Sequence, residues 1–407
     1  MKKHRVVIVG GGFGGVKAAL ELAGDDRFTI TLITTSPDFI YYPSLYHTAL
    51  GGRRAGSIIP LSDFFEGKGL TVIVDPAETI DRKAKTITTK NGEVVPYDSA
   101  IFALGVITNY FGIPGLEEYS FGIKSDKEIK EFKKHLHTQL INEMKPDLSY
   151  VVVGGGPTGI ELAGALPGYL KRIMKMHGIR GRAVHVDLVE ANPRLLPRLP
   201  RDAGRVIKRR LRHLGVKVYT NARVEGASAH SLTVNGKPIQ SHTVVWTAGV
   251  TNNPFFAANN FTITKNGKVA VDVYQRTEPD MYVIGDNANT PYSGMAQTAV
   301  EDARQVAANL RRVITDRPLK EYKVHEPWSV IPVGPRWAAA MRGGFRTYGL
   351  LGAFLRRASD FVAFHDYQPF IEAGHQWSRQ FGSEESCEHC RRELASDELA
   401  APWSSKL

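Results

Sequence analysis

The sequence predicts an α/β fold with two Rossmann-like units, followed by a C-terminal segment of a different character. Three observations support this prediction. An apolar run, a GxGxxG motif and a helical pattern follow one another at residues 6–23, and the same order returns at residues 150–166. Beyond Pro318 the chain becomes basic and aromatic. A repeated strand, glycine loop and helix is much rarer by chance than a single GxGxxG.

The composition is that of a globular protein. The 407 residues suffice for two or three domains, and 43% are hydrophobic and 23% charged. No apolar stretch approaches the roughly 18 residues of a spanning helix. The first apolar run breaks at once into glycines, unlike a signal peptide, so we expect a cytoplasmic chain. The net charge of +11 predicts an anionic partner but does not choose among nucleic acid, anionic lipid and nucleotides.

Cysteine usage excludes several kinds of chemistry. The two cysteines, Cys387 and Cys390, form a CEHC motif near the C-terminus. This excludes a disulfide framework and a catalytic cysteine in the first 386 residues. One CxxC pair lacks the four ligands of a closed zinc site, so we predict no metal. Pairing of two such motifs across a dimer is the alternative.

The first glycine motif follows the apolar run at residues 6–9 and precedes a helical pattern at residues 16–23. Its glycines are Gly10, Gly12 and Gly15. Glycines let the backbone approach a pyrophosphate, and the helix N-terminus offers N–H groups to its charge. The next strand, Phe28–Ile33, ends in Thr34 rather than in the acid that bonds a ribose. The motif predicts a dinucleotide site that lacks this acid.

The second glycine motif follows Tyr150–Val153 and has its acid. Its glycines are Gly154, Gly156 and Gly159. The next strand, Val184–Val189, ends in Glu190, which can bond both ribose hydroxyls and repel a 2′-phosphate. This favours NAD over NADP, although Arg194, Arg198 and Arg201 lie close by.

Shorter patterns complete each unit. Residues 70–105 read as short strands with an Asn91-Gly92 hairpin turn, and residues 111–115 read as a linker. VVWTAGV at residues 244–250 parallels AIFALGV at residues 100–106. A strand at 281–287 ends in Gly285-Asp286 and precedes a helix from about Met295 to Val313. Asp286 could bond a polyol or a phosphate-bound water, or could be a turn or N-cap aspartate.

The C-terminal segment contains a predicted amphipathic helix at Gly349–Phe364. Its apolar face consists of Leu351, Phe354, Leu355, Phe361 and Val362, with Arg356 and Arg357 off that face. Such a helix can lie in a membrane interface. Packing on the body of the protein and a dimer contact are the alternatives.

Seven motifs between Val6 and about Leu310 together resemble the flavoproteins with two dinucleotide-binding domains, whose fold is glutathione-reductase-like. They are VVIVGGGFGG, FALGVITNYFGIPG, VVVGGGPTGIELAGAL, VDLVEANPRLLP, VVWTAGV, VIGDNA and GMAQTAVEDARQVAANL. Within that superfamily the chain most resembles the type II NADH dehydrogenases, the single-subunit NADH:quinone oxidoreductases. The resemblance implies an FAD-binding domain at 1–112 and 253–320 and an NAD-binding domain at 113–252. It further implies a membrane-association or dimerisation segment at 321–382 and a mobile tail at 383–407.

The resemblance also implies roles for individual residues. FAD would be bound by Gly10, Gly12, Gly15, Pro43, Gly105, Asp286 and Ala296, and NADH by Gly154, Gly156, Gly159 and Glu190. Gly249, in the strand that parallels Gly105, is also expected to bind cofactor. Glu161 would lie beside the nicotinamide and flavin, where it orients the nicotinamide or helps to move protons; its alternative role is a helix cap. Gln297 would bond a quinone carbonyl or, alternatively, the flavin pyrimidine edge.

Three departures from the family pattern matter. Thr34 replaces the usual acid, and Glu301 and Asp302 stand where the family often has two glutamines, which affects the quinone site. The absence of thiols before Cys387 argues against disulfide reductases and sulfide:quinone reductases, because both need thiols near the flavin.

The function implied is that of an FAD-dependent NADH:quinone oxidoreductase without proton pumping. NADH gives a hydride to the flavin, and two electrons then pass to a membrane quinone. We expect a homodimer, peripheral on the inner face of the cell membrane at anionic lipid, with no nucleic acid partner. Two alternatives stay open: a soluble reductase of a small redox protein such as a ferredoxin, and an NADH-sensing flavoprotein without turnover.

Overall fold

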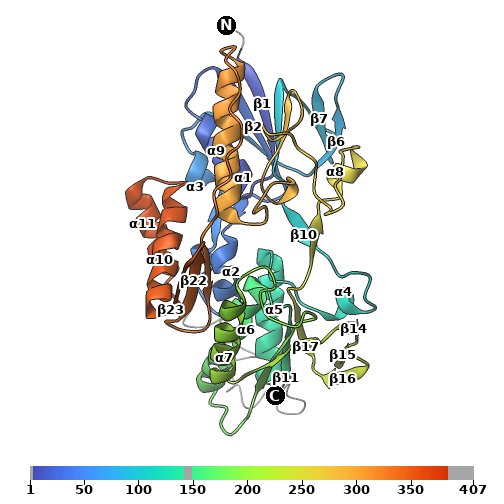
Figure 1. The fold of residues 1–407 in the computed structure, drawn as a ribbon, viewed down its shortest axis with the longest axis vertical. Coiled ribbons are helices and arrows are strands. Elements are labelled where there is room, and N and C mark those ends of the chain that lie inside the picture. Colours follow the sequence, from blue (N-terminus) through green and yellow to red (C-terminus); the bar gives the residue numbers. More distant parts are fainter. Residues whose placement is uncertain (1–2, 142–148, 384–407) are drawn as a thin grey trace, which may run out of the picture.

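The computed structural model describes residues 3–141 and 149–383. Two sheet-based units lie at opposite ends of an elongated molecule, and the C-terminal segment runs along one side of both (Figure 1). The predicted α/β fold with two similar units is confirmed. Cys387, Cys390 and the tail from residue 384 fall outside the described residues.

The first unit is built on a six-stranded sheet of order β19-β20-β9-β1-β2-β5. Its strands are β1 (His4–Val9), β2 (Phe28–Thr34), β5 (Thr71–Val74), β9 (Ser99–Phe102), β19 (Arg276–Glu278) and β20 (Met281–Val283). Strand β20 pairs with β9 in parallel, so residues from late in the chain complete this sheet. Helices α1 (Phe13–Leu22) and α9 (Ala296–Val313) pack against each other on one face, through Ala19, Leu22, Ala303, Val306 and Leu310.

The other face of this sheet is covered by a small sheet and a short helix. These are β6 (Ala77–Asp81), β7 (Thr86–Thr89), β8 (Val94–Pro96) and α8 (Phe255–Ala258). Strands β7 and β8 pair antiparallel around Gly92, which has a φ of +89°, so the predicted Asn91-Gly92 hairpin is confirmed. Val7, Phe102, Phe256 and Phe261 share the core beneath them.

The second unit is built on a parallel sheet of order β13-β12-β11-β17. Its strands are β11 (Ser149–Val153), β12 (His185–Val189), β13 (Val216–Tyr219) and β17 (Thr243–Trp246). Helices α5 (Asp126–Ile141), α6 (Pro157–Met176) and α7 (Arg201–His213) pack on it, together with a sheet of β14 (Val224–Ala227), β15 (Ser231–Val234) and β16 (Lys237–Gln240). Helix α5 begins with a capping box, in which Ser125 and Glu128 bond each other's backbone N–H groups.

The two units are joined by an antiparallel pair, β10 (Val106–Thr108) with β18 (Val250–Asn252). Short elements surround this connection: β3 (Asp38–Ile40), α2 (Tyr42–Ala49), η1 (Arg54–Gly56), β4 (Ile58–Pro60), α3 (Ser62–Phe65), α4 (Leu116–Tyr119) and η2 (Gly285–Asn287). The two glycine motifs follow the ends of β1 and β11. Both lie at the side of their sheet that faces this connection (Figure 1).

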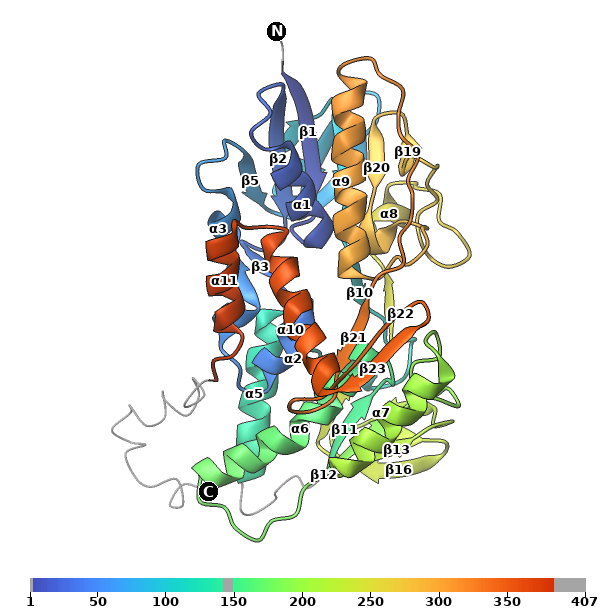
Figure 2. The ribbon, with the colours of Figure 1, turned by 60° about the vertical axis from the view of Figure 1, so that its left-hand side comes forward.

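The C-terminal segment forms a sheet and two helices beside both units (Figure 2). It comprises β21 (Ser329–Pro332), β22 (Ala338–Arg342), β23 (Phe345–Gly349), α10 (Leu350–His365) and α11 (Phe370–Arg379). Helix α10, predicted at Gly349–Phe364, lies so close to β22 that a Cβ at Gly352 would collide with the Ala338 carbonyl oxygen. Its end reaches the first unit, where the Tyr367 hydroxyl donates to the Phe13 carbonyl at 3.0 Å. Among the described helices, none has the length and apolar character required to span a membrane.

Candidate functional site

The first glycine loop combines two positions that must be glycine with one that leaves open space. Gly10 has a φ of +116°, and a Cβ there would collide with the Ala103 carbonyl. A Cβ at Gly15 would collide with the carbonyl oxygen of Gly10. At Gly12 a Cβ would meet no atom within 4 Å. The loop is therefore closed behind by packing and open in front of the α1 N-terminus, which fits a pyrophosphate.

The second glycine loop repeats this geometry. Gly154 has a φ of +118°, and a Cβ there would lie 2.9 Å from Ala248 backbone atoms. A Cβ at Gly159 would collide with the Gly154 carbonyl, whereas Gly156 again has nothing within 4 Å. The structure thus holds two cradles of the same construction, each at the N-terminus of a helix.

The acid of the second cradle supports the loop directly. Glu190 is buried, and one of its carboxylate oxygens accepts the Gly155 N–H at 2.6 Å. The other oxygen accepts the backbone N–H of Asn192 at 2.6 Å. Arg194 donates instead to the carbonyls of Leu196 and Leu199, at 3.1 and 2.8 Å. The Arg194 guanidinium is thus committed to its own loop.

Thr34, which replaces the acid in the first cradle, lies beneath the loop. It is 5% exposed, and its hydroxyl donates to the Ser36 carbonyl at 3.2 Å. A Cβ at Gly11 would come within 2.5 Å of that hydroxyl. Thr34 therefore fills the space under the glycine loop with a small side chain.

Gly105 and the Gly285-Asp286 turn are held together by Asn287. The Asn287 amide accepts the Gly105 N–H at 2.8 Å and donates to the Gly105 carbonyl at 2.7 Å. Burial raises the pKa of Asp286, while Lys268 and Lys124 oppose this shift. The sequence prediction included Gly105 and Asp286 but not Asn287, which follows them directly in the GDN motif.

Ala296 and Gln297 begin α9. The Gln297 side chain is exposed, and its carbonyl oxygen accepts the backbone N–H of Trp328 at 3.0 Å. Because the oxygen is engaged, the amide nitrogen is the end oriented for donation to another group. Gly249 lies in the matching loop of the second unit, where its carbonyl accepts the Asn109 N–H at 3.1 Å.

Glu161 lies in the first turns of α6 and is 8% exposed. Its side chain does not cap the helix but faces Arg356 of α10, with 3.5 Å between Nη1 and Oε1. Arg356 also donates through Nε to Asp360 at 2.9 Å and through Nη2 to the Pro43 carbonyl. This cluster brings Pro43, Glu161 and the C-terminal segment together.

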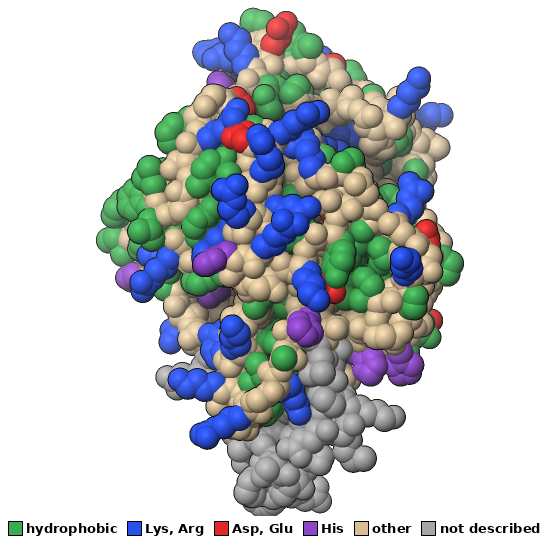
Figure 3. Space-filling model, turned by 60° about the horizontal axis from the view of Figure 1, so that its bottom comes forward, with side chains coloured by type: hydrophobic (Ala, Val, Ile, Leu, Met, Phe, Trp, Pro, Cys, Tyr) green, Lys and Arg blue, Asp and Glu red, His purple; other side chains and the backbone are tan. Residues whose placement is uncertain are grey.

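The sequence prediction placed both Arg356 and Arg357 off the apolar face of the helix, and the structure separates the two residues. Only 13% of the Arg356 side chain is exposed, because it projects between α2 and α6, whereas Arg357 is exposed. The outer face of α10 and α11 is apolar, and its exposed side chains are Leu350, Leu351, Phe354, Val362, Phe370 and Ile371. In Figure 3 hydrophobic side chains gather on the side where these helices lie, and Lys and Arg outnumber Asp and Glu across the same view.

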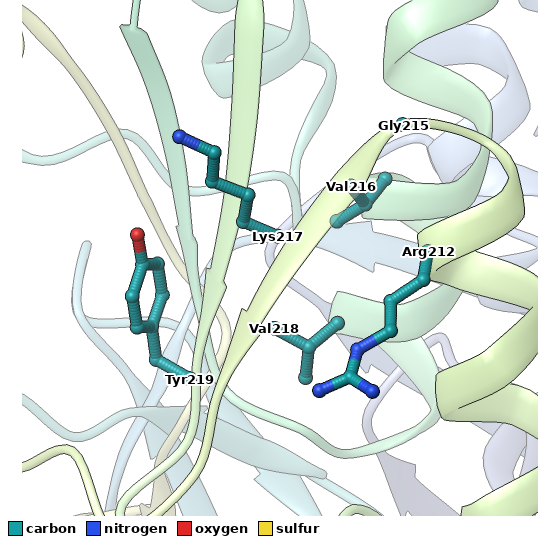
Figure 4. A pocket seen from close by; sticks show the side chains of 6 residues that line it. All are labelled: Arg212, Gly215, Val216, Lys217, Val218 and Tyr219. Carbon is teal, nitrogen blue, oxygen red and sulfur yellow. The ribbon is translucent and has the colours of Figure 1, made fainter.

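A shallow pocket of about 360 Å³ runs along the edge strand β13 (Figure 4). It is lined by Arg212, Gly215, Val216, Lys217, Val218 and Tyr219. None of the predicted site residues lines this pocket, so it is separate from the two cradles.

Comparison with known proteins agrees with this geometry. The family model described as pyridine nucleotide-disulphide oxidoreductase matches residues 4–303. The type II NADH:quinone oxidoreductase NdhA of Mycobacterium tuberculosis is 31% identical over 353 residues, which cover 79% of this chain and 75% of that protein. The type II NADH:quinone oxidoreductase of Staphylococcus epidermidis is 25% identical over 88% of this chain and 94% of its own length.

Solved structures share the fold at low sequence identity. NDH2 from Plasmodium falciparum in complex with NADH superposes with a TM-score of 0.83 at 17% identity, covering 93% of this chain and 97% of that one. The sulfide:quinone oxidoreductase of Aquifex aeolicus superposes with a TM-score of 0.74 at 19% identity, covering 96% and 94%.

Proposed function

The chain belongs to the pyridine nucleotide-disulphide oxidoreductase family and, within it, to the type II NADH:quinone oxidoreductases, and from this membership we propose how its residues perform the reaction. The protein is an enzyme that uses FAD, oxidises NADH and reduces a quinone. The two cradles of equal construction, open at Gly12 and at Gly156, support this function most directly. When bound, FAD supplies the chemistry that couples hydride removal from NADH to two-electron reduction of the quinone.

We assign the first cradle to FAD and the second to NADH. In this proposal Gly10, Gly12, Gly15, Pro43, Gly105, Asp286 and Ala296 hold FAD, and Gly154, Gly156, Gly159, Gly249 and Glu190 hold NADH. Glu190 supports the assignment of NADH, because a buried carboxylate at a ribose favours hydroxyls over a 2′-phosphate. The commitment of Arg194 to backbone carbonyls leaves that guanidinium without a role in binding a phosphate. The FAD unit then comprises 1–112 and 253–320, and the NAD unit 113–252.

Gln297 and Glu161 are proposed to act on the acceptor side. The oriented amide nitrogen of Gln297 is suited to donate to a quinone carbonyl oxygen. Glu161 is buried beside a guanidinium, where a carboxyl group can hold and release a proton. Burial raises the pKa of Glu161 to about 8, against the opposing charge of Arg356.

We further propose that the apolar face of α10 and α11 rests on a membrane, at the inner face of the cell membrane. Leu350 is 74% exposed and Phe370 is 67% exposed, which is unusual for a free surface, and the basic side chains nearby suit anionic lipid. A homodimer contact would use the same kind of surface. In vesicle flotation, the full-length protein is expected to bind vesicles that contain anionic phospholipid, and less so in high salt. Phe354→Ser should weaken binding, whereas Val273→Ser, at an exposed valine of the first unit, should leave it unchanged.

The function is tested by an acceptor screen on purified protein whose flavin has been identified. We expect a yellow protein with bound FAD that oxidises NADH, rather than NADPH, when a short-chain quinone is supplied. Reduction of a ferredoxin-type protein without reduction of any quinone would contradict the proposal, as would bound FAD with negligible turnover for every acceptor.

A further inference from the structure

The inward face of α10 consists of four residues spaced four apart: Gly352, Arg356, Asp360 and Phe364. Gly352 lets the helix lie against β22, and Phe364 packs on the Tyr41 ring with 4.5 Å between ring centres. Arg356 and Asp360 lie between these contacts, with side chains 13% and 11% exposed. A buried arginine and a buried aspartate cost free energy unless their partners are well placed, so their arrangement matters.

The contacts of Asp360 fix Arg356 on one side. One Asp360 oxygen accepts Arg356 Nε at 2.9 Å, and the other accepts the Tyr41 hydroxyl at 2.7 Å. Arg356 Nη1 donates to the Val330 carbonyl at 3.2 Å, and Nη2 donates to the Pro43 carbonyl. Every nitrogen of the guanidinium is thus held by a group other than Glu161.

Glu161 makes the longest of the polar contacts to this guanidinium. Among the described residues, its side-chain partner is Nη1 of Arg356 at 3.5 Å, which is the limit of a hydrogen bond, and Nη1 is shared with the Val330 carbonyl. The charged and titratable groups that face Glu161 are Arg356 and Asp360 from α10 and Tyr46 from α2. Burial raises the pKa of Glu161, Arg356 lowers it, and the negative charge of Asp360 raises it further, to about 8.

We propose that Asp360 and Tyr41 are positioning residues of the quinone half-reaction: they hold Arg356 back from Glu161, so that the Glu161 carboxyl carries the proton that quinone reduction requires. The inference deepens the proposed function and rests on it. The C-terminal segment then has two roles. Its outward side forms the apolar face of α10 and α11, and its inward side forms part of the active site, because α10 supplies both Arg356 and Asp360.

The reaction balances as NADH, one proton and a quinone giving NAD⁺ and a quinol. Both electrons come from NADH, one proton accompanies the hydride, and the second proton comes from solvent. The protonated Glu161 carboxyl passes this second proton to a quinone oxygen by breaking its O–H bond, and solvent then restores it. Ferricyanide accepts single electrons without protons, so two ferricyanides oxidise one NADH and need nothing from Glu161.

The test compares these two acceptors in the holoenzyme over pH 5.5 to 9, with a water-soluble quinone and without vesicles. Asp360→Asn removes the competing anion, so Arg356 turns to Glu161 and favours its ionised form. The decline of quinone turnover should move to lower pH by about one unit, which makes turnover at pH 8 roughly fivefold below wild type. Ferricyanide turnover and the flavin spectrum should stay unchanged.

Two further variants keep the inference falsifiable if Asp360→Asn does not fold. Tyr41→Phe removes only the hydroxyl that holds one Asp360 oxygen, so Asp360 orients Arg356 less firmly, and the profile should shift in the same direction by less. Arg357→Gln, at the exposed neighbour of Arg356, should leave both profiles unchanged.

Three results would separate the possible failures. Equal loss with both acceptors at every pH would show that Asp360 is merely structural and overturn the inference. An unchanged quinone profile in folded Asp360→Asn and Tyr41→Phe would overturn it too. A wild-type enzyme that reduces ferricyanide but no quinone would instead overturn the proposed function.

Discussion

The Asp302 carboxylate accepts a hydrogen bond from the backbone N–H of Gly285 at 2.9 Å. Asp302 is fully buried in α9, beneath the turn that presents Asp286. Its neighbour Glu301 points elsewhere, 3.7 Å from His325. Asp302 stands where the family often has a glutamine. It therefore supports the Gly285-Asp286 turn and does not occupy a quinone-facing position.

Asp302→Leu is expected to weaken FAD binding. The substitution leaves the buried Gly285 N–H without its acceptor, which costs about 1–3 kcal/mol if the turn does not rearrange. We expect FAD affinity, measured by fluorescence titration of apoprotein, to fall roughly tenfold. Glu301→Gln on the neighbouring position is the control. Unchanged affinity in folded Asp302→Leu would contradict this role.

The glycines of the cradles should separate binding from folding. Gly12→Val should give colourless protein, and Gly156→Val should give yellow protein that NADH no longer reduces, because each side chain fills space intended for a pyrophosphate. Neither position clashes within the protein, so the melting temperature without ligand should change little. Gly15→Val is the contrast, since its side chain collides with Gly10 and should destabilise the fold itself. Yellow Gly12→Val protein would refute the assignment of the first cradle.

Glu161→Gln should change how stability depends on pH. The pKa of Glu161 is raised by burial from 4.5 to about 8, so its favourable protonated state is present at pH 4.5 and is lost as pH rises toward 8. Compared with wild type, Glu161→Gln should be similar in melting temperature at pH 5 and more stable at pH 8. The same substitution at Glu301 should show no such trend. If the melting temperatures of wild type and Glu161→Gln differed by the same amount at both pH values, this would contradict a buried Glu161 carboxyl with a raised pKa.

His135 should make the second unit sensitive to acid. Burial lowers its pKa to about 4, the charge of His242 lowers it as well, and its ring bonds the Thr243 hydroxyl at 2.8 Å. The neutral form is favoured in the fold, so stability is full above pH 6.5 and is lost as pH falls toward 4. His135→Gln should flatten the melting temperature between pH 6.5 and 4.5, while His325→Gln, at an exposed histidine, should not.

The sequence predicted both cradles and the hairpin because local patterns encode them. Gly10 and Gly154 must be glycine for reasons visible within a strand, turn and helix, and Asn91-Gly92 specifies its own turn. The helix at 350–365 was predicted for the same reason, from its periodicity. Its orientation was not fully predicted, because the apolar side faces outward and the inward side carries Arg356 and Asp360.

Such contacts depend on residues far away in the chain. Arg356 donates to the Pro43 carbonyl, 313 residues before it, and Asp360 accepts from Tyr41, 319 residues before it. No local pattern contains that information. The spacing of Gly352, Arg356, Asp360 and Phe364 is the one signal that could have indicated a second, inward face.

The pairing of β20 with β9 also has a consequence for how the enzyme is made. Both glycine loops leave the ribosome early, but the strand at 281–283 that completes the first sheet appears only after the entire second unit. Arg356 follows later still, so a nascent chain that ends before residue 350 carries both loops without the guanidinium that faces Glu161. Translation therefore completes the second unit before the first sheet can be completed.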